Sequence, residues 1–208
     1  MIEIVENAVQ LALLVVCIAI SGRNAARSRE RADVILVMFF GTFALGDLYW
    51  LLYRVFYGET PQLFYVADLS WYAAYLFLYL LLQELSDPGE RRVRHPVVLV
   101  FPAFAAVMCA FYMKWGDYLG NVMSAVLMTM LMVHAARGLL WLRDRPQAAR
   151  RRALYIVVLI FCAIEYGDWT TSCFWSGDTW RNPYFWFDCL LTLSFAFFLP
   201  AYRKAVPA

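Results

Sequence analysis

The sequence predicts an all-α membrane protein built as a single bundle of seven transmembrane helices. Of its 208 residues, 63% are hydrophobic and 16% are charged, and the mean hydropathy is +0.58. A chain this apolar cannot cover a soluble domain with polar side chains, so much of its surface must face lipid. The apolar residues gather in seven stretches, each long enough at about 1.5 Å per residue to cross roughly 30 Å of hydrocarbon. We therefore expect one domain over residues 1–208.

Each span is defined by an apolar stretch and by the turn residues beside it. The first opens with Glu3 and Glu6 instead of a basic segment, so we interpret it as a helix and not as a cleaved signal peptide. Proline-containing segments at residues 58–61, 86–89 and 182–183 mark turns between later spans. The helices are expected at residues 2–21, 33–56, 62–84, 96–114, 118–141, 153–174 and 184–203.

The basic residues predict how the bundle is oriented. Fifteen of the 18 Lys and Arg residues follow the first, third, fifth and seventh spans, which all end on the same side of the membrane. Arg54, Lys114 and Arg181 are left for the other side. Because basic residues concentrate on the cytoplasmic side, we expect the N-terminus outside and the C-terminus in the cytoplasm.

A pattern of acidic residues occurs twice along the chain. Gly46-Asp47 in the second span is followed by Asp68 in the third, and Gly167-Asp168 in the sixth by Asp188 in the seventh. This recurrence fits a 3+1+3 parallel repeat, with units at 1–85 and 118–205 and a linker helix at 96–114, which is a known transporter plan. Chance is the alternative, because Gly-Asp is a common dipeptide and the halves share little else.

These carboxylates lie inside apolar spans, where an unpaired charge costs about 3 kcal/mol even on lenient insertion scales. On the second and third spans, polar and aromatic residues recur at the i, i+3 and i+7 spacing of one helical face. Counted from the outer helix ends, most of these groups lie in the outer half of the bilayer. We therefore predict one outward-facing acidic and aromatic pocket, with the candidate ligand-binding residues Asp47, Trp50, Arg54, Asp68, Trp71, Tyr72, Tyr75, Asn121, Glu165, Asp168, Trp169 and Asp188.

Three interpretations of this cluster stay open from the sequence. It could be a structural hydrogen-bond network centred on Arg54, a ligand cavity in which Arg54 tethers one or two of the acids, or a site of metal or proton chemistry. A metal would have to be a hard cation, because carboxylates are the available ligands. His95 and His134 are expected at the cytoplasmic interface, and the five cysteines lack zinc-type spacing. Aromatic residues such as Phe195, Phe197 and Phe198 are expected to face lipid.

The segment from Gly46 to Tyr75, with GDLYW, GETP and ADLSWYAAY, resembles the seven-helix sensory membrane regions that precede diguanylate cyclase or histidine kinase modules in bacteria. The resemblance covers about 30 residues. It implies a multi-pass protein of the bacterial cytoplasmic (inner) membrane. Since the 208 residues contain no segment resembling an output module, signalling would need a partner protein on the cytoplasmic side. Covalent retinal is not expected, because Lys204 at the cytoplasmic end is the only lysine of the seventh span.

The function that we predict is a receptor or sensor for a small polar or cationic ligand, a lipid headgroup or a cation. A transporter of small solutes or cations built on the repeat is the first alternative. An intramembrane enzyme that acts on lipid through paired carboxylates is the second, and no nucleophile motif such as G-x-S-x-G supports it. Apart from a hard cation at the carboxylates we expect no cofactor, and the expected partners are membrane lipid, the ligand and the signalling protein, with no nucleic acid.

Overall fold

A computed structural model describes residues 2–59, 61, 66–143, 145 and 150–206 of the chain. Within these residues there are seven α-helices and no strands, and all seven helical segments are long and apolar enough to cross a membrane, which confirms the predicted fold class. The helices are α1 (Ile2–Ser28), α2 (Arg31–Tyr57), α3 (Val66–Leu85), α4 (Val100–Tyr112), α5 (Tyr118–Leu142), α6 (Arg152–Ser172) and α7 (Pro183–Ala205).

The predicted boundaries differ from the observed ones mainly at α1 and α4. α1 continues seven residues beyond the predicted end at residue 21, because its arginines extend the helix instead of forming a loop. α4 reaches membrane-spanning length only with the 3-10 turns η2 (Pro96–Leu99) and η3 (Met113–Trp115) at its two ends. Residues 62–65, predicted to begin the third span, lie outside the described residues.

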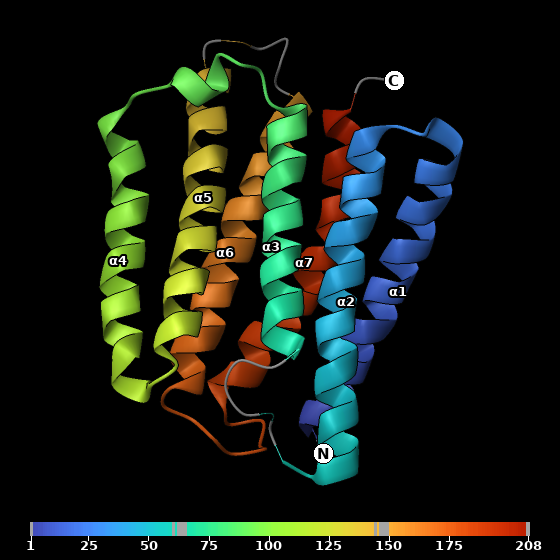
Figure 1. The fold of residues 1–208 in the computed structure, drawn as a ribbon, viewed down its shortest axis with the longest axis vertical. Coiled ribbons are helices and arrows are strands. Elements are labelled where there is room, and N and C mark those ends of the chain that lie inside the picture. Colours follow the sequence, from blue (N-terminus) through green and yellow to red (C-terminus); the bar gives the residue numbers. More distant parts are fainter. Residues whose placement is uncertain (1, 60, 62–65, 144, 146–149, 207–208) are drawn as a thin grey trace.

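Six of the helices form a closed ring. α1 packs on α2, α2 on α3, α3 on α5, α5 on α6, α6 on α7, and α7 returns to α1. α4 lies outside this ring against α5, at the edge of the bundle opposite α1 (Figure 1). The N-terminus and the C-terminus lie at opposite ends of the bundle (Figure 1), as an odd number of spans requires.

Aromatic side chains fill the middle of the ring. Phe39, Phe43, Phe161, Phe195 and Phe198 are each at most 2% exposed, and their rings meet at tilted and edge-to-face angles, with the centroids of Phe43 and Phe195 4.7 Å apart. Edge-to-face contacts of this kind stabilise a core beyond the area they bury. The prediction that Phe195 and Phe198 face lipid was therefore wrong, whereas Phe197 is 54% exposed.

The end of the bundle that holds the C-terminus is closed by a buried ion pair. Glu90, in the 3-10 turn η1 (Glu90–Arg92), is 1% exposed and accepts a hydrogen bond from the Tyr155 hydroxyl of α6. Arg151 Nη2 lies 2.9 Å from Glu90 Oε1 and donates a 2.5 Å hydrogen bond to Asp87 Oδ2. Burial alone would lower the pKa of Arg151, but the hydrogen bond to Asp87 and the charge of Glu90 outweigh burial and raise it. This network fixes the loop between α3 and α4 to the start of α6.

Candidate functional site

The opposite end of the bundle contains a cavity of about 610 Å³ that all seven helices help to line. It lies where α1, α3, α5 and α7 begin and where α2, α4 and α6 end. All twelve residues proposed from the sequence as ligand-binding line this cavity, so the structure brings the whole predicted set together. Its volume falls within the range of about 300–1,000 Å³ typical of small-molecule sites.

Asp47 of α2 forms a buried hydrogen-bonded group with its neighbours. It is 1% exposed, and its two carboxylate oxygens accept hydrogen bonds from Gln10 Nε2 at 3.0 Å and from Trp71 Nε1 at 2.9 Å. Gln10 Oε1 in turn accepts a 2.6 Å hydrogen bond from the Thr192 hydroxyl of α7. This chain of contacts joins α1, α2, α3 and α7 across one wall of the cavity.

The two glycines of the recurring Gly-Asp pairs have the same packing role. A Cβ atom on Gly46 would lie 2.6 Å from Trp71 Nε1 of α3, and one on Gly167 would lie 2.3 Å from Cε1 of Phe187 in α7. Real Cβ contacts are essentially never shorter than 3.0 Å. In each half of the chain, the missing side chain therefore allows an aromatic ring of the following helix to lie directly against the helix that carries the Asp.

α6 contributes two carboxyl groups to the cavity, and they differ in their bonding. Glu165 is 2% exposed and accepts a 2.9 Å hydrogen bond from the Tyr75 hydroxyl of α3. Asp168 is 9% exposed, yet its Oδ1 atom receives no hydrogen bond from any residue that the structure describes. The hydroxyl of Tyr166, a residue that is 5% exposed, also lacks a partner there. Buried polar atoms without partners are rare, and each calls for an explanation such as a bound ligand.

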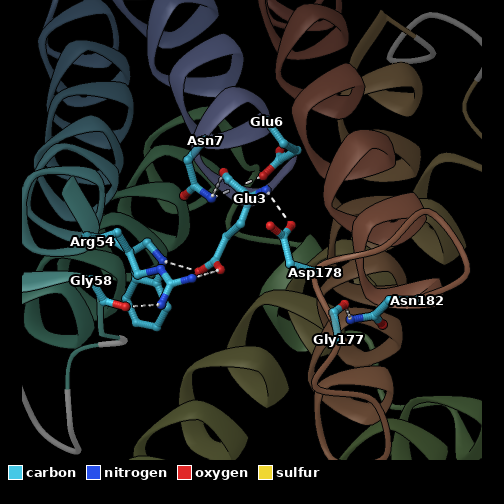
Figure 2. A network of polar contacts seen from close by, with 9 residues as sticks. Glu3, Glu6, Asn7, Arg54, Gly58, Gly177, Asp178 and Asn182 are labelled. Carbon is cyan, nitrogen blue, oxygen red and sulfur yellow. Dashed lines mark hydrogen bonds and ion pairs between the residues drawn. The ribbon is translucent and has the colours of Figure 1, made fainter. Parts of the chain in front are cut away.

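Within the described part of the chain, Arg54 does not form an ion pair with any of the intramembrane acids that the sequence suggested as its partners. Its Nη2 atom forms a 2.6 Å ion pair with Glu3 of α1, and its Nη1 donates to the Gly58 carbonyl at 3.2 Å (Figure 2). The Trp50 indole donates to the same Glu3 carboxylate at 3.2 Å. Glu3 also donates its backbone N–H to Asp178 in the loop after α6 (Figure 2). Arg54 is thus a tether for the start of α1 at the mouth of the cavity, not the centre of the predicted acid network.

The sequence analysis missed the contribution of α1 to the site. Glu3, Asn7 and Gln10 all line the cavity, and Glu6 accepts a 3.3 Å hydrogen bond from the Thr192 hydroxyl of α7. The signal was present in the sequence, because residues 3, 7 and 10 follow the i, i+4 and i+7 spacing of one helical face.

The charge on the cavity wall is strongly unbalanced. Among the described residues that line it, eight carry carboxyl groups and Arg54 is the one basic residue. The acidic residues are Glu3, Asp47, Asp68, Asp117, Glu165, Asp168, Asp178 and Asp188. Even with several of these groups protonated, such a wall attracts cations and repels anions.

Metal ligation finds little support in this geometry. Over the described residues, no three His, Cys, Asp or Glu side chains come together as a metal site requires. All five cysteines are free. His134, expected at the interface, is instead 7% exposed at the far end of the bundle, with Gln83 Nε2 3.4 Å from its Nδ1 atom. It is buried because Tyr79 and Tyr155 pack their rings against it.

Comparison with known proteins gives no match, since no family model fits the chain and no curated protein or solved structure is significantly similar to it.

Proposed function

We propose that this protein is a membrane receptor or sensor that binds a small organic cation in the cavity formed by its seven helices. The observation that carries the proposal is Asp168, whose Oδ1 atom is buried in the cavity wall without a hydrogen-bond partner among the described residues. A buried carboxylate that lacks a partner is costly, and a cationic ligand would remove that cost by ion pairing.

The aromatic residues beside Asp168 suit an organic cation better than a bare ion. Trp169, Tyr166 and Tyr112 line the same part of the cavity, with the Tyr166 and Trp169 ring centroids 5.3 Å apart. Ammonium groups over aromatic faces gain about 0.5–2 kcal/mol, the larger values applying where water is excluded. A hard metal ion would instead need six or more oxygen ligands around one point.

We infer the direction in which the cavity opens from the distribution of basic residues. Arg91, Arg92, Arg151 and Arg203 are all at the end of the bundle away from the cavity. With that end in the cytoplasm of a bacterium, the cavity would face outward and sample ligands outside the cell. A signalling partner would then contact the cytoplasmic end.

Thermal unfolding of the purified protein in a nonionic detergent tests the proposal, with ethylammonium chloride as the probe and sodium chloride as the salt control. Binding to the native state at 100 times Kd should add about 2.7 kcal/mol to the free energy of unfolding. We expect the rise in unfolding temperature with wild-type protein and its loss with Asp168→Asn.

Asp33→Asn is the matched control, because Asp33 is a buried acid at the far end of the bundle, where Tyr202 and Ser28 donate hydrogen bonds to it. This variant should keep the full response to ethylammonium. If Asp168→Asn and Asp68→Asn both respond as strongly as the wild type, the proposed site is wrong.

A transporter is the second candidate, and the order of the helices favours it. In the first half of the ring, α1 contacts α2, α2 contacts α3 and α3 contacts α5. The second half has the same order, because α5 contacts α6, α6 contacts α7 and α7 contacts α1. This is the order that a parallel 3+1+3 repeat with α4 as linker would produce. Uptake of labelled ethylammonium by reconstituted vesicles, lost in Asp47→Asn and Asp168→Asn, would select the transporter over the sensor.

A further inference from the structure

A second space lies between α4 and α5, in the form of an apolar groove of about 610 Å³. Ala106 and Ala110 of α4 lie on one side of it, and Val122, Val126 and Met130 of α5 on the other. Among the described residues that line the groove, Thr129 contributes the only hydroxyl group. Because both helices span the membrane, the groove lies at the depth of the hydrocarbon chains.

The groove and the polar cavity share part of their walls. Cys109 of α4 and Ala125 of α5 line both spaces. These are small side chains, so the seam between the two helices is thin at the point where the two spaces adjoin. The groove therefore adjoins the candidate site across these two side chains.

Tyr166, whose hydroxyl has no partner among the described residues, packs against α4. The Tyr112 hydroxyl of α4 donates a 3.2 Å hydrogen bond to the Tyr166 carbonyl of α6 and lies 2.8 Å from Thr170 Oγ1. The Phe104 ring packs edge to face on Tyr166, with the centroids 4.9 Å apart. Tyr166 therefore faces α4, next to the helix that forms one wall of the groove, and Asp168 lines the same cavity two positions further along α6.

We propose that the ligand is a cationic amphiphile with a single alkyl chain, a refinement that rests on the proposed function. Its ammonium group pairs with Asp168 in the cavity, and its chain passes between Cys109 and Ala125 into the groove. A purely polar ligand would leave the groove unused, and an uncharged lipid would leave Asp168 without a counter-ion. The chain gains little by moving from lipid to an equally apolar groove, so the head group provides the selectivity and the groove accommodates the chain.

Photolabelling tests the position of the chain. The probe is a long-chain alkylamine with a diazirine at its chain end, added to the wild-type protein in a nonionic detergent and located by peptide mass spectrometry. We expect the label to concentrate on residues 102–113 and 122–130, and to fall at least tenfold when ethylammonium is present in excess. Label spread evenly over the lipid-facing sides of all seven helices, insensitive to ethylammonium, would overturn the inference.

A pair of variants separates the groove from the head-group site. Ala106→Phe with Ala110→Phe fills the groove, and both positions are exposed on α4, so the fold should tolerate the rings. Ala103→Phe is the control, because Ala103 is also exposed on α4 but lines neither space. The double variant should lose the groove label and keep the thermal response to ethylammonium, whereas Ala103→Phe should keep both.

Two outcomes have distinct meanings. If the double variant is labelled in the groove like the wild type, the proposed position of the alkyl chain is wrong. If the same variant still responds to ethylammonium in the thermal assay, the proposed cation site is unaffected by that result. A wild-type protein with no thermal response to ethylammonium refutes the proposed function and this refinement together.

Discussion

Substituting Gly46 by alanine tests whether the packing of α2 against α3 holds Asp47 in place. The new Cβ would lie 2.6 Å from Nε1, 2.8 Å from Cδ1 and 3.0 Å from Cε2 of Trp71. These are atoms of a rigid indole and not the end of a flexible chain, so the ring as a whole must move. The atom nearest to the added methyl group is the nitrogen that donates to Asp47 Oδ1 at 2.9 Å.

The expected cost combines three terms. Overpacking typically costs about 1–3 kcal/mol, and leaving Asp47 without one of its two donors costs about 1–3 kcal/mol because it is buried. Alanine in place of glycine returns up to about 1 kcal/mol of helix propensity. The free energy of unfolding should therefore fall by about 1–5 kcal/mol.

Reversible unfolding in a denaturing detergent, followed by tryptophan fluorescence, measures this change. Gly41→Ala is the matched control, because Gly41 lies in the same helix and nothing occupies the space within 4 Å of its added Cβ. The control should be as stable as the wild type or slightly more so. The reasoning about Gly46 is refuted if Gly46→Ala is as stable as Gly41→Ala.

Three further variants probe other buried contacts. Arg151→Met leaves Glu90 buried without its ion pair and should cost about 3–5 kcal/mol in the same unfolding assay; a loss below about 1 kcal/mol would contradict the buried pair. Glu3→Gln removes the charge that fixes the start of α1, so hydrogen exchange of its first-turn amides should accelerate, and unchanged protection would show that the ion pair is dispensable. Tyr75→Phe removes the donor to Glu165 and should lower the free energy of unfolding by about 1–3 kcal/mol. A variant more stable than the wild type would contradict this role of the hydroxyl.

The spans and the residues around the cavity could be predicted because two periodicities are visible in the sequence. Apolar stretches of sufficient length identify the helices, and residues at i, i+3, i+4 and i+7 identify a face, as with Asp68, Trp71, Tyr72 and Tyr75. Once the helices alternate in direction, groups at similar depth must meet near one end of the bundle. The pattern on the first helix obeys the same rule, but its acids were considered only as evidence against a signal peptide.

Other features depend on three-dimensional packing and leave no local signal. Core and lipid are equally apolar, so composition cannot distinguish the buried Phe195 from the exposed Phe197. Arg54 had several acids within reach in principle, and only the helix arrangement assigns it to Glu3. The burial of Glu90 likewise arises from the way a loop folds over α6. The orientation of the bundle in the membrane and the 3+1+3 duplication stay predictions.

An experimental density map of the wild-type protein in a nonionic detergent, recorded with and without ethylammonium, tests the central claim most directly. We expect ligand density within hydrogen-bonding distance of Asp168 Oδ1, and ordered water in the cavity when the ligand is omitted. A map in which the acids are each bonded to neighbouring side chains, with no space between them in either condition, would contradict the claim.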